Sequence, residues 1–140
     1  MRFLAPLLLV LLLAGCGGRP ALRAESSPRP PDADAQAEYL MDSAVADFAA
    51  HRPPYPAAVR NVRLGFVVDA QGARQYLISG DFMPAEAAGA DGWVPFVTIR
   101  TSGYEQWLGG QAAAFCREAP IVWLDPDLSG ILQGRLDPQR

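Results

Sequence analysis

The pair Pro53-Pro54 separates two stretches with different spacing of apolar side chains, and this change most limits the folds open to the chain. Before the prolines, residues 34–51 place apolar side chains at helical spacing, which predicts an amphipathic helix with one core-facing stripe. After them, every second residue of 62–68 is apolar, which predicts a half-buried strand. Proline ends the helix because it lacks an N–H group and disfavours helical backbone at the preceding residue. We therefore expect a helix followed by a sheet within one domain, residues 34–140.

Shorter segments of strand or helix character complete that domain. Residues 75–82 follow a turn and are expected to return as the second strand of a hairpin, and residues 93–100 are expected to form a third strand. Residues 110–120 predict a short helix, residues 121–124 are a candidate fourth strand, and the final residues show no clear pattern. Strands joined by short turns pair antiparallel, and a helix must cover the apolar face of such a sheet. The expected fold class is α+β: an N-terminal helix packed on a three- to four-stranded antiparallel sheet in two layers, with a short C-terminal helix.

The first fifteen residues have the pattern of an export signal. A leucine-rich apolar run, Phe3–Ala14, follows Arg2 and is shorter than the roughly 20 residues that span a bilayer. It leads into Leu-Ala-Gly-Cys, residues 13–16, which resembles the lipobox of bacterial lipoproteins. That resemblance implies that residues 1–15 are removed as a lipoprotein signal peptide and that Cys16 carries a diacylglycerol group and an added fatty acid such as palmitate. The alternative is an ordinary signal peptide that is cut elsewhere.

The residues that follow the lipobox indicate where an anchored domain would sit. In the enterobacterial sorting rule an aspartate after the lipidated cysteine keeps a lipoprotein in the inner membrane, whereas this chain has Gly17. Residues 16–33 are rich in proline and arginine, which predicts a flexible tether with a reach of up to about 50 Å. We therefore expect a protein of the cell envelope that is anchored in the outer membrane through the lipid on Cys16 and faces the periplasm.

Composition excludes several classes of function. The net charge is −3, the chain contains no lysine, and no block of basic residues is present to neutralise phosphates, so a nucleic-acid partner is not expected. Without lysine the chain can form neither a P-loop phosphate site nor a Schiff base. His51 is the single histidine, which excludes a metal site built on two histidines. We expect no metal and no cofactor.

Two groups of polar residues have the spacing of functional sites but are better explained as surface. Ser43, Asp47 and His51 lie four residues apart on one face of the predicted helix. A serine inside a helix lacks the strained, exposed position and the oxyanion hole that a nucleophile needs. Asp125 and Asp127 suggest calcium, but a calcium loop needs more oxygen ligands, and a Pro-Asp turn accounts for both residues. The chain is therefore expected not to be an enzyme.

A second resemblance covers residues 60–116. The stretches "VRNVRLG", "YLISGDF" and "GADGWVPF" are similar to an uncharacterised group of small exported bacterial proteins. The matching positions are Arg60, Asn61, Val62, Arg63, Gly80, Phe82, Gly89, Gly92, Trp93 and Phe96. The group usually has a cysteine at the position of Ser79, so this chain leaves Cys116 without an internal partner. We expect Cys116 to be a buried, inert thiol, with a reactive thiol or an intermolecular disulfide as alternatives.

The best candidate for a binding site is the loop from residue 83 to residue 92 together with its aromatic neighbours. Loops on a rigid sheet often carry binding residues, and tryptophan is enriched at binding hot spots. Trp93 has a second interpretation, because a tryptophan at the start of a strand also serves as core. The turn after the third strand is expected to add two aromatic side chains to the same surface. The candidate residues are Met83, Glu86, Asp91, Trp93, Tyr104 and Trp107.

Together these patterns predict a non-enzymatic envelope lipoprotein whose tethered periplasmic domain binds a protein or a cell-wall component. An alternative within the same class is a proteinaceous inhibitor of a wall-degrading hydrolase, because an acidic domain is attracted to a basic enzyme. An alternative of another class is a small hydrolase that works through His51.

Overall fold

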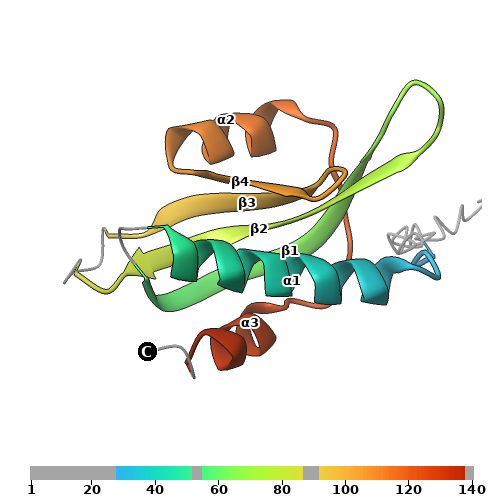
Figure 1. The fold of residues 1–140 in the computed structure, drawn as a ribbon. Helices are drawn as coiled ribbons and strands as arrows, with labels where there is room; N and C mark the ends of the chain where they lie inside the picture. Colours follow the sequence, from blue (N-terminus) through green and yellow to red (C-terminus); the bar gives the residue numbers. More distant parts are fainter. Residues whose placement is uncertain (1–27, 52–54, 87–91, 138–140) are drawn as a thin grey trace, which may run out of the picture.

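The computed structural model describes residues 28–51, 55–86 and 92–137. Those ranges contain α1 (Ala33–Ala50), β1 (Pro56–Val68), β2 (Arg74–Pro84), β3 (Val94–Arg100), β4 (Tyr104–Leu108), α2 (Gly110–Glu118), β5 (Val122–Trp123) and α3 (Ser129–Leu136). The strands form one antiparallel sheet in the order β4-β3-β2-β1-β5 (Figure 1). The predicted α+β class, the N-terminal helix on the sheet and the short helix within 110–120 are confirmed.

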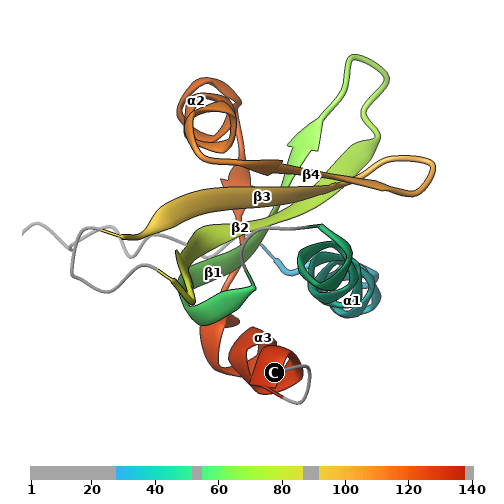
Figure 2. The same cartoon turned by 60° about the vertical axis from the view of Figure 1, so that its left-hand side comes forward.

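Three features of the arrangement differ from the expectation. The sheet has five strands, one more than the expected maximum of four, because residues 104–108 form β4 rather than a turn. The C-terminal segment forms α3, although its sequence shows no clear pattern. The two-layer arrangement is wrong, because α1 and α3 lie on one face of the sheet and α2 lies on the opposite face (Figure 2). The domain therefore has three layers, with the sheet in the middle.

The face of the sheet toward α1 and α3 holds the larger core. The helical stripe of α1 turns Leu40, Met41 and Phe48 inward, where they are buried. Three phenylalanines then connect the layers: Phe48 of α1, Phe82 of β2 and Phe96 of β3, with ring centroids 4.9 to 6.3 Å apart. The predicted apolar stripe of the helix is therefore core, as expected.

A smaller core lies on the opposite face, under α2. Leu77 of β2 and two residues of β3, Val97 and Ile99, are buried there. At its margin Trp107 of β4 meets Phe115 of α2 edge-on, with ring centroids 5.2 Å apart. Strands β2 and β3 bury consecutive residues because helices cover both of their faces. None of the helices in the described ranges is long and apolar enough to cross a membrane.

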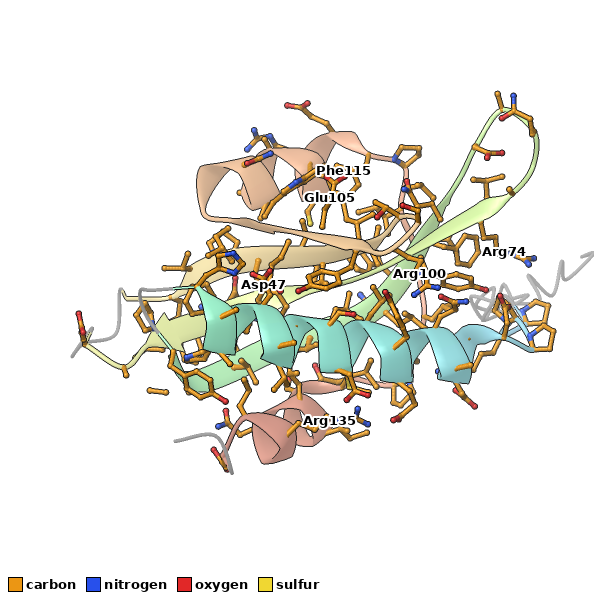
Figure 3. All side chains as sticks on the ribbon, viewed as in Figure 1. Asp47, Arg74, Arg100, Glu105, Phe115 and Arg135 are labelled. Carbon is orange, nitrogen blue, oxygen red and sulfur yellow. The ribbon has the colours of Figure 1, made fainter. Side chains whose placement is uncertain are left out.

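The edge of β1 that β5 leaves unpaired is completed by α3. The backbone N–H of Val62 donates to Oγ of Ser129 at 2.9 Å, and the backbone N–H of Val59 donates to Oε1 of Gln133 at 2.9 Å. The side chain of Arg135 then pairs with two acidic residues of α1 (Figure 3). The last helix therefore satisfies strand donors that would otherwise lack a partner, and it holds α1 against the sheet.

Tyr76 of β2 connects the sheet to the segment before α1. Its hydroxyl group donates to Oδ1 of Asp32 at 2.7 Å, and only 3% of the residue is exposed. Burial, together with the Asp32 carboxylate, raises the pKa of Tyr76 to about 12. The unfolded chain loses this proton near pH 10, so the stabilisation tied to the protonated phenol is complete below pH 10 and is lost between pH 10 and about 12.

Tyr76→Phe is expected to lower the free energy of unfolding by about 1–2 kcal/mol at neutral pH, because it removes this hydrogen bond. It should also flatten the fall in stability between pH 10 and 12. Urea unfolding followed by circular dichroism from pH 7 to 12 measures both effects. Tyr39→Phe is the control, because Tyr39 is 36% exposed on α1. If the free energy of unfolding falls equally steeply with pH above pH 10 in the wild type and in Tyr76→Phe, the raised pKa of Tyr76 is contradicted.

Candidate functional site

A pocket with a volume of about 250 Å³ opens beside α2 on the sheet face that this helix covers. Walls come from β1, β2, β3, β5 and α2. The side chains that give it chemistry are Asn61 and Arg63 from β1, Ser79 and Asp81 from β2, Cys116 from α2 and Trp123 from β5. We call this cavity the bulge pocket, after the irregularity in β1 that forms one of its walls.

Asn61 lies in a β-bulge. The register between β1 and β2 shifts by one residue at this point, so Asn61 and Val62 both lie opposite Gly80. Asn61 has a φ of 55°, in the left-handed region that asparagine tolerates better than most residues. Gly80 allows the close approach, because a Cβ there would lie 2.8 Å from the carbonyl oxygen of Arg60. The bulge therefore depends on Asn61 in β1 and Gly80 in β2. It turns the side chains of β1 toward the pocket.

Asp81 is the acidic group of the bulge pocket. Its Oδ2 accepts hydrogen bonds from Nδ2 of Asn61 at 3.0 Å and from Nε of Arg60 at 3.2 Å. The guanidinium of Arg60 also lies over the ring of Trp93, 4.2 Å from its centroid. These contacts hold the carboxylate in place and attach the start of β3 to the margin of the site.

Arg63 is the basic group of the bulge pocket. Its Nη2 lies 3.7 Å from Oδ1 of Asp125, and its guanidinium lies 5.5 Å from the centroid of the Trp123 ring. The Asp125 side chain is 83% exposed, so solvent screens this long ion pair. Arg63 can therefore exchange this contact for a ligand at little cost.

Cys116 reaches the same pocket from α2. Its Sγ lies 3.2 Å from Oγ of Ser79, and Ser79 also donates its hydroxyl proton to the carbonyl oxygen of Phe96 at 2.9 Å. The expectation that Cys116 is largely buried is wrong, because the residue is half-buried between the smaller core and the pocket. In the described part of the chain its thiol is free of any disulfide.

Ser79→Cys is expected to form a disulfide with Cys116 under oxidation, because the two side-chain atoms already lie 3.2 Å apart. The two positions are 37 residues apart, so chain entropy predicts a stabilisation of about 3–4 kcal/mol. Thiol titration and non-reducing electrophoresis detect the bond, and chemical denaturation measures its effect. Ser43→Cys is the control, because Ser43 lies on α1 across the sheet. Two free thiols in oxidised, folded Ser79→Cys would contradict the contact.

The candidate loop borders the pocket through one residue. Trp93 stacks on Arg60 beside the pocket, which supports its inclusion in the site. Met83 lies half-buried near the end of β2, and Glu86 is exposed just beyond that strand. Asp91 lies outside the described residues. None of the described residues of the candidate loop lines the pocket, and the loop as a binding surface stays a prediction.

Tyr104 does not share that surface, so its assignment to it is wrong. Tyr104 lies opposite the last residue of β3, about 20 Å of strand away from Trp93. It faces α1, where burial and the nearby Asp47 carboxylate raise the pKa of Tyr104. Trp107 lies on the same sheet face as the bulge pocket, where it packs against Phe115 in the smaller core and does not line the pocket. Figure 3 shows Phe115 and Asp47 on the two sides of the sheet.

The chain was also compared with known proteins. No family model matches it, and neither curated proteins nor solved structures give a significant match.

The polar groups weighed for catalysis and metal binding have other contacts. Ser43 is 7% exposed and donates its hydroxyl proton to the carbonyl oxygen of Tyr39 at 2.8 Å. His51 follows α1, and its Nδ1 lies 3.3 Å from Oδ1 of Asp47. The structure thus pairs His51 with Asp47 and directs Ser43 to the backbone. Within the described residues no three His, Cys, Asp or Glu side chains are grouped to hold a metal.

Reasoning from the sequence missed most of the bulge pocket, although two signals were present. Arg60 and Asn61 are consecutive polar residues inside a strand, and such a break in alternation is typical of a bulge. Gly80 lies inside the neighbouring strand, where an isolated glycine indicates close approach of another backbone. Neither signal indicates that Cys116 and Trp123 join the same site.

Proposed function

We propose that this chain is a non-enzymatic, lipid-anchored protein of the cell envelope whose domain binds a protein or a cell-wall component at the bulge pocket. The observation that carries the proposal is the pocket itself. It combines one basic side chain, one acidic side chain, the amide of Asn61, the hydroxyl of Ser79 and a thiol with a tryptophan on a rigid sheet. A concave site with a few fixed polar groups is the usual form of a ligand-binding site.

The lipobox supports an anchor on Cys16, and Gly17 supports an outer-membrane position facing the periplasm. Both residues lie outside the described part of the chain. The base of the tether is described: Nη1 of Arg29 donates to the backbone carbonyl of Asp125 at 2.6 Å. Asp125 is also the ion-pair partner of Arg63, so the tether would join the domain near the proposed site.

An affinity experiment with envelope extract tests the proposal. The immobilised full chain is compared with Arg63→Gln and Asp81→Asn, and captured proteins and wall fragments are identified by mass spectrometry. At least one partner of the wild type should be lost from both variants. Arg117→Gln is the matched control, because this arginine of α2 is 72% exposed and its ion pair is with the adjacent Glu118. Retention of every partner by the folded variants would move the site away from the bulge pocket.

The same experiment separates the alternatives. Capture of a wall-degrading hydrolase that loses activity in the complex would identify an inhibitor. A hydrolase that works through His51 would lose its function in His51→Ala, whereas a binding protein would keep its partners.

A further inference from the structure

We propose that the bulge pocket recognises a zwitterionic α-amino-acid centre, which is one carbon that bears both an ammonium and a carboxylate group. The inference rests on the proposed function, because it assigns a ligand class to the same site. Arg63 binds the carboxylate, and Asp81 binds the ammonium.

The charges of the pocket lining carry the argument. Arg63 and Asp81 place one positive and one negative side chain on the walls of a single small cavity. A ligand with one charge would use only one of them and leave the other with its existing contact alone, Arg60 for Asp81 or Asp125 for Arg63. A zwitterion pairs with both. The planar guanidinium of Arg63 also matches a carboxylate in two parallel hydrogen bonds.

Both charged groups have capacity for a ligand. The 3.7 Å separation between Arg63 and Asp125 exceeds the length of a strong charge-assisted hydrogen bond. Asp81 accepts both of its side-chain hydrogen bonds at Oδ2, and its Oδ1 accepts none from the described residues. Their side chains are 42% and 27% exposed, respectively. Each group is therefore positioned by the protein and still open to solvent.

The size of the pocket and its neutral residues fit a single amino-acid group. Its volume of about 250 Å³ lies below the roughly 300–1,000 Å³ of pockets for drug-sized ligands. Ser79 gives its proton to a backbone carbonyl, so its oxygen, which contacts the thiol of Cys116, has a second lone pair that can accept a bond from an ammonium. Trp123 and Cys116 supply an apolar wall for the side chain of the ligand.

Two sources in an envelope share this chemistry. One is a free amino acid, and the other is the distal stereocentre of a diaminopimelate residue in a wall peptide, which carries both groups on one carbon. Free alanine represents the first source, and the tripeptide alanyl-glutamyl-diaminopimelate represents the second. N-acetylalanine and alaninamide are matched probes that each lack one charge.

Titration calorimetry with the full chain in mild detergent tests the proposal. Arg63→Gln and Asp81→Asn should each weaken binding of the zwitterionic probes about tenfold or more, and Arg117→Gln should leave it unchanged. Binding of alaninamide, which lacks the carboxylate, should not depend on Arg63. Binding of N-acetylalanine, which lacks the ammonium, should not depend on Asp81. Tighter binding of the tripeptide than of alanine would assign the wall as the source, and the reverse order would assign free amino acids.

The outcomes separate this inference from the proposed function. The proposal of a zwitterionic ligand is overturned if the folded wild-type chain binds neither alanine nor the tripeptide. It is also overturned if the chain binds N-acetylalanine as tightly as either of them. If Arg63→Gln still loses a partner from envelope extract in that case, binding at the pocket stands and only the ligand class fails. Circular dichroism checks the fold of Asp81→Asn, which touches the bulge. Arg63→Gln provides a second variant, because Arg63 takes no part in the hydrogen bond between Asn61 and Asp81.

Discussion

Phe96→Ala is expected to lower the free energy of unfolding by about 3–5 kcal/mol, the range for truncation of a buried phenylalanine. Phe96 is fully buried, and its ring centroid lies 5.5 Å from that of Phe48 and 6.3 Å from that of Phe82. Truncation leaves a cavity where α1 meets β2 and β3. Small domains are stable by only about 5–15 kcal/mol, so the melting temperature should fall by more than about 10 °C.

Urea unfolding followed by circular dichroism measures this loss. Val68→Ala is the control, because Val68 is 51% exposed near the tip of the first hairpin. Its effect should be about 0.5 kcal/mol or less. A midpoint for Phe96→Ala that matches the control would contradict the central position of Phe96 in the core.

Cys16→Ser is expected to abolish lipid attachment and the removal of residues 1–15. A serine hydroxyl cannot replace the thiol that receives the diacylglycerol group in proteins with a lipobox. Two or more acyl chains anchor a protein stably, whereas one gives only marginal binding at about 0.8 kcal/mol per buried CH₂. Incorporation of labelled palmitate should therefore fall to background in the variant, and the unprocessed precursor should accumulate.

Cys116→Ser is the matched control, because it changes the other cysteine of the chain by the same single atom. It should incorporate palmitate as the wild type does and should fractionate with the membrane. Equal labelling and normal processing of Cys16→Ser would contradict the anchor. That result would leave the bulge pocket and its ligand class to be tested separately.

The parts of the fold that depend on near neighbours in the chain were predictable from the sequence. Apolar spacing and the Pro53-Pro54 pair identify α1 and the start of the sheet, and both are observed. The first hairpin follows from its turn, where Gly72 adopts a φ of 83° and the Asp69 carboxylate accepts two backbone N–H groups. In each case the residues that decide the structure lie within one element or one turn.

Two elements needed the tertiary structure. Helix α3 has eight residues, two of them glycine, and a helix of that length is marginal in isolation. It forms because Leu132 and Leu136 are buried and because Ser129 and Gln133 accept backbone N–H groups of β1. Strand β4 is five residues long at the edge of the sheet, and it is defined by pairing with β3.

The candidate site also has features that the sequence determined and features that only the tertiary structure decided. The sequence by itself determined that Trp93 lies next to the start of a strand and that Gly80 lies inside one. Only the tertiary structure decided that Arg63 and Asp81 share a pocket, because their positions depend on a one-residue register shift between β1 and β2. It also brought Cys116 to within 3.2 Å of Ser79. Register and layer order depend on packing between residues far apart in the chain, and local patterns of side chains do not specify such contacts.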